Sequence, residues 1–159
     1  MKNIRGFTLI ETLIYLALFG IIIGGVSAGV YAIIEGAGRT QTKIFLQEEG
    51  DFLTAKINWA LSGASDISVA SNPLGLKVDK FVYANNPLVF NLTGNDLTLS
   101  EGAGAPQILN PSAVKVGNLI LQDIPGQPEG VLVSFTLSAP AQNGSVITQD
   151  FEVTKYLRK

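Results

Sequence analysis

Residues 7–34, FTLIETLIYLALFGIIIGGVSAGVYAII, decide the fold of this chain. No charged side chain occurs from Thr12 to Ile34. At roughly 1.5 Å of rise per residue, a helix over this run is long enough to cross a hydrocarbon core of ~30 Å. Glu11 is the exception, because its carboxylate stands near the start of an otherwise apolar run. The sequence therefore predicts a membrane-length helix and leaves the purpose of Glu11 to be explained.

The glycines of this run are a second feature. They stand at Gly20, Gly24, Gly25 and Gly29, and two of the spacings are Gly-x-x-x-Gly. Such spacings let helices approach closely in lipid, although glycine is also simply common in membrane helices. Glycine weakens a helix by up to ~1 kcal/mol per residue relative to alanine. We therefore expect a locally softened helix between Gly20 and Gly29.

Residues 35–61 continue the helical period but become amphipathic. Phe45, Phe52 and Trp59 fall seven residues apart, and a parallel row contains Leu46, Leu53, Ile57 and Ala60. Together the rows predict one broad apolar stripe packed on a globular core, with Trp59 inside it. Ser62-Gly63 is expected to end the helix. A continuous helix from Phe7 to Leu61 would be about 80 Å long.

The remaining residues predict strands and turns. Residues 89–100 indicate a hairpin around Gly94-Asn95-Asp96, and residues 118–124 alternate apolar and polar side chains. Residues 130–138 and 145–153 are expected to pair across an Asn143-Gly144 turn. The segment 101–113 is rich in Gly, Ala and Pro and predicts a surface loop. The fold class is therefore α+β, with a long N-terminal helix packed on one small antiparallel sheet.

Composition excludes several functions. The chain of 159 residues has no histidine and no cysteine, so imidazole, thiol and disulfide chemistry are impossible. A formal net charge of −2 does not suit a nucleic-acid binder. Asp123 and Glu129 bracket a Pro/Gly loop, but two carboxylates are few for calcium. Glu48, Glu49 and Asp51 suit a solvated helix surface. We expect no catalytic residue, no metal, no cofactor and no enzymatic activity.

Two simple interpretations of the N-terminus leave Glu11 without a purpose. A secretory signal peptide would have Val26-Ser27-Ala28 as its cleavage site, but the apolar run before it is longer than usual. A plain membrane anchor would have its basic end inside. A carboxylate at mid-bilayer costs roughly 2.5–3.5 kcal/mol on insertion scales, although it costs less near an interface.

Residues 5–11, RGFTLIE, resemble the processing motif of the type IV pilin superfamily, which includes pilins, minor pilins and the pseudopilins of type II secretion. The resemblance implies a cleaved leader at residues 1–6, with prepilin peptidase cutting between Gly6 and Phe7. It also implies N-methylation of Phe7, and it makes Glu11 the fifth residue of the mature chain. Residues 7–34 would then be a transmembrane and filament-core helix, and residues 35–159 a pilin-like head.

The resemblance also gives Glu11 a role in assembly. Cleavage would create a positive amine at Phe7, within reach of Glu11 on a neighbouring subunit. Because a buried carboxylate is tolerable only when it is paired, this contact would favour one register between packed helices. The absence of cysteine favours a minor pilin or pseudopilin over a disulfide-closed major pilin. The expected partners are other pilin subunits, prepilin peptidase and the cytoplasmic membrane, with the head outside before assembly and in a cell-surface or periplasmic filament afterwards. The alternative is a signal-anchored or secreted β-rich binding domain that does not assemble.

Overall fold

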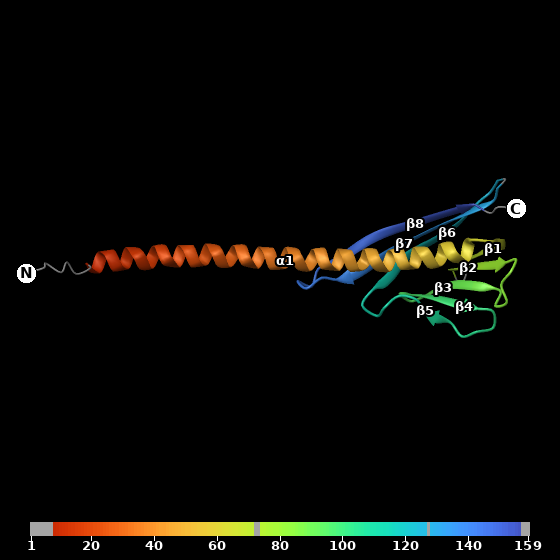
Figure 1. Ribbon diagram of the computed structural model, residues 1–159, viewed down its shortest axis with the longest axis horizontal. Helices are drawn as coiled ribbons and strands as arrows, with labels where there is room; N and C mark the ends of the chain where they lie inside the picture. Colours follow the sequence, from red (N-terminus) through yellow and green to blue (C-terminus); the bar gives the residue numbers. More distant parts are fainter. Residues whose placement is uncertain (1–7, 72–73, 127, 157–159) are drawn as a thin grey trace, which may run out of the picture. The chain divides into compact units, whose positions relative to one another are not determined.

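The computed structural model describes residues 8–71, 74–126 and 128–156. Within these residues, one helix, α1 (Leu9–Leu61), precedes eight strands, and every strand pairing is antiparallel (Figure 1). The α+β class and the long N-terminal helix predicted from the sequence are confirmed. The chain divides into two compact units, residues 1–38 and residues 39–159. We call the second of these the head unit and describe each unit by itself.

In the first unit, the described residues are helical from Leu9 onward, and their side chains are exposed along almost the whole length. Leu, Ile, Val, Phe and Tyr dominate this exposed surface. By length and composition, α1 contains a segment that could cross a membrane. Such a surface needs an apolar environment, because water is a poor solvent for it on every side.

The head unit contains two sheets, so the expectation of a single sheet was wrong. The first sheet has the order β1-β2-β3-β4-β5 and the second has the order β6-β7-β8. Pro111 follows shortly after β5, where a residue without a backbone N–H is poorly suited to extending a strand. The bounds are β1 Ala64–Ser71, β2 Leu74–Lys80, β3 Leu88–Thr93, β4 Asp96–Glu101, β5 Gln107–Ile108, β6 Lys115–Ile124, β7 Gly130–Pro140 and β8 Val146–Tyr156.

Both predicted hairpins are present. In the β3–β4 hairpin, Thr93 pairs with Asp96 across Gly94-Asn95, and Gly94 has a φ of 64°. A positive φ at the first central position is the reason that a glycine suits this turn. In the β7–β8 hairpin, Pro140 pairs with Val146, and Gly144 in the connecting loop has a φ of 79°.

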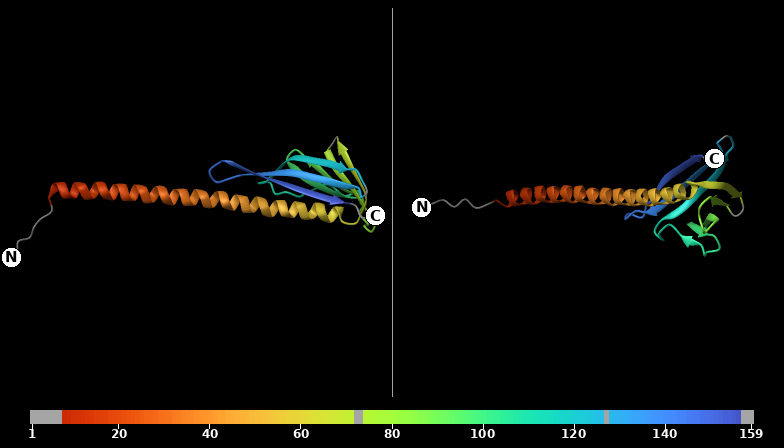
Figure 2. Two further views of the ribbon diagram at one scale, coloured as in Figure 1. Left: turned by 90° about the horizontal axis from the view of Figure 1, so that it is seen from above. Right: turned by 45° about the vertical axis from the view of Figure 1, so that its right-hand side comes forward.

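The core of the head unit lies between the second half of α1 and the two sheets, which Figure 2 shows on one side of that half. Leu46, Leu53 and Ile57 are almost wholly buried against the inward side chains of the strands. The helix can approach β8 closely because Gly50 has no side chain, and a Cβ there would overlap the ring of Phe151. That ring in turn stacks on Phe135, with 5.5 Å between the ring centroids.

The aromatic row of the predicted stripe is not in the core, which corrects the expectation for two of its residues. Phe52 remains 43% exposed and Trp59 39% exposed, and Phe45 is partly buried. Residues 52 and 59 each precede a buried residue, Leu53 and Ala60, by one position. One position is about 100° around a helix, so the aromatic row lies at the edge of the buried stripe.

Segment 101–113 also departs from its prediction as a plain surface loop. Most of it is exposed, but Asn110 is only 4% exposed. Its side-chain carbonyl accepts a hydrogen bond from the Leu97 backbone N–H at 2.8 Å, and its amide donates to the Val114 carbonyl at 2.7 Å. This buried amide therefore ties the segment to the end of the β3–β4 hairpin and to the start of β6.

Candidate assembly site at the start of the helix

Glu11 forms a capping box with Thr8 at the first turn of α1. Its Oε2 accepts hydrogen bonds from the Thr8 backbone N–H at 3.1 Å and from the Thr8 hydroxyl at 3.0 Å. In return, the Glu11 backbone N–H donates to Thr8 Oγ1 at 3.3 Å. These reciprocal bonds satisfy backbone donors that a helix N-terminus otherwise leaves unpaired. The negative charge also lies at the positive end of the helix dipole.

The other polar group of this turn is satisfied inside the helix. The Thr12 hydroxyl donates to the Leu9 carbonyl at 2.8 Å. Hydroxyl bonds of this kind let a polar side chain remain in an apolar helix, because no partner has to come from the surroundings. Glu11 is therefore the only ionisable side chain of the described segment from Thr8 to Ile34 apart from two tyrosines, and it is exposed.

Gly6 and Phe7, the two residues at the predicted cleavage point, lie outside the described residues. Of the three predicted site residues, the structure accordingly describes only Glu11. Thr8 was missed as a site residue, although the sequence contains its signal. A Thr-x-x-Glu pattern directly before an apolar run is a capping-box signature in its own right.

The glycines of the apolar run have open surroundings. Among the described residues, nothing lies within 4 Å of a Cβ built on Gly20, Gly24, Gly25 or Gly29. Packing among the described residues of the monomer therefore does not require the absence of a side chain at these positions. Any packing that does require it involves another molecule.

Of the carboxylates predicted to be solvated, Glu48 and Asp51 are exposed and Glu49 is partly exposed. Asp51 accepts a hydrogen bond from the Gln47 amide at 2.9 Å. Asp123 and Glu129, which were considered as calcium ligands, are both exposed. Within the described ranges, no three Asp or Glu side chains gather as they would around a metal ion.

Residues 1–27 match the family model described as the prokaryotic N-terminal methylation motif. The match includes the leader, the predicted cleavage point and the Thr8–Glu11 capping box, and it extends into the exposed apolar part of α1. No match was found among curated proteins, and none among solved structures. The match and the apolar helix are together consistent with membrane anchoring. The chain thus carries the type IV pilin-like prepilin signal.

Proposed function

We propose that this chain is a structural subunit, minor pilin-like or pseudopilin-like, of a type IV pilus or of a filament of the type II secretion kind. The observation that carries the proposal is the methylation motif at residues 1–27, which leads into a helix exposed on all sides. A subunit stored in lipid and later packed into a filament core has an apolar environment in both places. The same helix surface therefore serves both states without refolding.

Processing follows from the motif. Prepilin peptidase would cut between Gly6 and Phe7 on the cytoplasmic side and remove Lys2 and Arg5 with the leader. The new amine of Phe7 would then be methylated. Cleavage removes two basic side chains and leaves a positive amine at Phe7, four residues before Glu11, which becomes the fifth residue of the mature chain.

The capping box supplies hydrogen-bond donors to the Glu11 carboxylate before assembly. While the subunit is in the membrane, Thr8 supplies two hydrogen bonds to the carboxylate. On assembly, the Phe7 amine of a neighbour would add an opposite charge, which is the stronger partner in a medium of low dielectric. The penalty for an unpaired buried charge then selects the helix register in which amine and carboxylate meet.

The implied partners are other pilin-like subunits, prepilin peptidase and the cytoplasmic membrane. The head unit would lie outside the cytoplasm before assembly and on the cell surface or in a periplasmic filament afterwards. No cofactor and no enzymatic step is needed for this role.

The mass of the mature protein in membrane fractions tests the proposal. We expect a chain that begins at methylated Phe7, and we expect Gly6→Val to keep the leader because the peptidase must fit a residue without a side chain. A chain that begins at Met1 would identify a plain anchor. A chain that begins at Gly29 would identify a secreted domain, and either result would refute the proposal.

Filament entry is the second part of the test. The processed chain should be recovered in filaments sheared from cells, together with other pilin-like subunits. Correct processing with no recovery in any filament fraction would show that the prepilin signal here serves a protein that does not assemble.

A further inference from the structure

Aromatic rings and lysines alternate along one surface of the head unit. The Lys56 ammonium lies 5.9 Å from the centroid of the Phe52 ring and 5.7 Å from that of the Trp59 ring. The Lys80 ammonium lies 4.5 Å from the Trp59 centroid and donates to the Trp59 carbonyl at 2.8 Å. Tyr83 meets Trp59 edge to face at 5.6 Å. Such contacts hold the lysines in place while their charge stays accessible.

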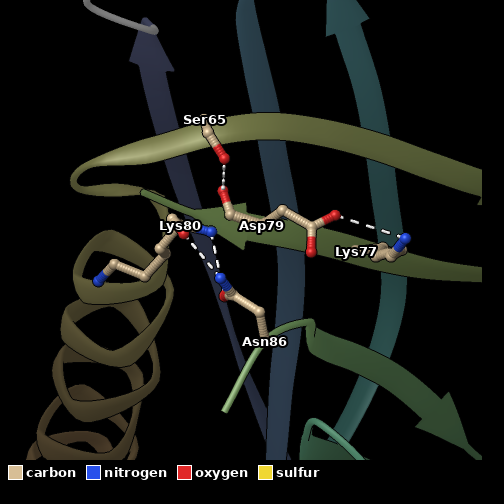
Figure 3. Close-up of polar contacts among 5 residues, drawn as sticks. All are labelled: Ser65, Lys77, Asp79, Lys80 and Asn86. Atoms are coloured by element: carbon tan, nitrogen blue, oxygen red, sulfur yellow. Dashed lines mark hydrogen bonds and ion pairs between the residues drawn. The ribbon is translucent and has the colours of Figure 1, made fainter. Parts of the chain in front are cut away.

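A clamped loop stands beside this row. The Asn86 side chain accepts from the Lys80 N–H at 3.1 Å and donates to the Lys80 carbonyl at 2.6 Å, which closes the loop at its base (Figure 3). Farther along, the Tyr83 hydroxyl donates to Glu101 Oε2 at 2.7 Å, and this bond is the main cause that raises the pKa of Tyr83. Hydrogen bonds therefore hold the base of the loop, whereas two apolar residues within it are highly exposed. Phe81 is 76% exposed and Val82 is 93% exposed.

This surface has the properties of a binding knob. Its apolar tip projects from a base that hydrogen bonds hold in place, so less conformational entropy is lost when it docks. The ammonium groups of Lys56 and Lys80 favour a partner surface that is both concave and negatively charged. We call the surface formed by Phe52, Lys56, Trp59, Lys80, Phe81, Val82 and Tyr83 the lysine–aromatic knob.

The head unit itself carries a surface with the complementary properties. The outer face of the β6-β7-β8 sheet contains an open hollow of about 570 Å³. A register shift between Gly117 and Ile120 bends β6 there, and Asn118 has a φ of 48°. The side chains that face outward around the hollow are Asn118, Ile120, Ser134, Thr136, Asp150 and Glu152.

The hollow is acidic, and hydrogen bonds connect some of the side chains that line it. Asp150 and Glu152 are two residues apart on β8 and share its outer face, opposite Thr136 and Ser134. The Asn118 amide donates to Thr136 Oγ1 at 3.3 Å, and the Thr136 hydroxyl donates to Asp150 at 2.6 Å. Glu152 and the 55%-exposed Ile120 complete a site with both negative charge and apolar surface.

We propose that the lysine–aromatic knob of one subunit docks in the acidic hollow of a second copy of this chain. The second half of α1 covers the inner face of the β6-β7-β8 sheet, whereas the hollow is on the outer face, so the two surfaces do not compete within one molecule. A contact between two different patches is heterologous, and it can therefore repeat from copy to copy along a filament. The contact rests on the proposed function for its biological setting, but it can be measured without a filament.

Crosslinking of the full chain tests the contact, and the absence of cysteine from the sequence makes each introduced thiol unique. One tagged chain carries Val82→Cys in the knob, and a differently tagged chain carries Ser134→Cys in the hollow. After mixing in detergent and treatment with a short thiol–thiol crosslinker, we expect the heterodimer. The control pairs Val82→Cys with Ser68→Cys, because Ser68 is a strand serine that is more exposed than the half-buried Ser134 and lies outside the hollow. An equal yield from the control pair, or no heterodimer from the test pair, overturns the inference.

Charge exchange provides the second measurement. Glu152→Lys should lower the crosslink yield about fivefold, which is the order of one surface charge pair. Adding Lys56→Glu to the Val82→Cys chain should restore most of the yield, because the signs are exchanged and the attraction returns. Failure of the restoration would show that the charges do not meet.

These outcomes are separable from those of the proposed function. Correct processing and normal filaments with no specific crosslink would overturn only the knob-and-hollow contact. A specific crosslink from a chain that is never processed or sheared into filaments would overturn only the filament role.

Discussion

The two halves of α1 belong to one helix, but their apolar side chains have opposite surroundings. Residues 9–38 expose their apolar side chains on every side, whereas residues 39–61 bury Leu46, Leu53 and Ile57 against the strands of their own unit. The second half acquires its apolar environment by folding. The first half can acquire one only from its surroundings, lipid or another subunit, and the role that we propose for Glu11 accordingly lies in a contact between subunits.

The glycines show the same contrast. Gly50 lies where the ring of Phe151 leaves no room for a Cβ, whereas a Cβ on Gly24 would meet nothing within 4 Å among the described residues. One glycine is required by the fold of the head unit, and the other is free of any such requirement in the monomer.

The largest expected effect comes from comparing the carboxylate of Glu11, in the first half of α1, with that of Glu48, in the second half. Glu11→Leu should insert and be cleaved normally but should enter filaments at least about a hundredfold less well, because an unpaired buried amine costs roughly 3–5 kcal/mol. Glu11→Asp should be intermediate, since it keeps the charge with a shorter reach. Glu48→Leu, on the exposed surface of the second half, is the matched control and should have little effect. The measurement is the fraction of each variant in sheared filaments relative to membranes.

Normal filament entry by Glu11→Leu would remove the pairing role. Because a subunit at a filament tip has neighbours on one side only, co-purification with other pilin-like subunits should be scored in the same experiment.

A cavity in the second half should have the next largest effect. Leu53→Ala should lower the free energy of unfolding of the head unit by about 2–5 kcal/mol, because it removes a fully buried side chain. Leu16→Ala, in the exposed half, should leave this free energy unchanged. Denaturant unfolding of the full chain in detergent, followed by circular dichroism of the strands, measures both variants. Equal effects of the two variants would contradict the contrast between the halves.

The glycine comparison gives a smaller effect with a change of sign. Gly50→Ala should destabilise the head unit by about 1–2 kcal/mol, because overlap with Phe151 outweighs the gain in helix propensity. Gly24→Ala should instead stabilise the helix by up to ~1 kcal/mol without affecting the head unit. The same unfolding measurement, with helix content recorded separately, tests both. A stabilised Gly50→Ala head unit would show that β8 can move away from the helix at little cost.

The smallest effect concerns the edge of the buried stripe. Trp59→Ala should cost only about 1–2 kcal/mol, because the ring is partly exposed and contributes mainly through Tyr83 and Lys80. A fully buried aromatic would cost about 3–5 kcal/mol. A loss of about 3–5 kcal/mol in the free energy of unfolding would show that Trp59 belongs to the core. Such a result would weaken the inference that Trp59 is part of a binding surface.

Much of the fold follows from local pattern. The uncharged run after Glu11 predicts the exposed half of α1, Ser62-Gly63 marks its end, and the turn at Gly94-Asn95 marks a hairpin. The Thr-x-x-Glu pattern predicts the capping box, because both partners are three residues apart on one helical turn. These features depend on neighbours in sequence, so the sequence by itself determined them.

Only the tertiary structure decided the rest. Whether Phe52 and Trp59 or Leu53 and Ala60 face the core is a rotation of about 100°, and periodicity alone does not fix it when both rows are apolar. The division into two sheets depends on contacts between residues far apart in sequence, including the buried amide of Asn110 with Leu97. The requirement for Gly50 comes from Phe151, about a hundred residues later, because close packing between distant segments has no local signal.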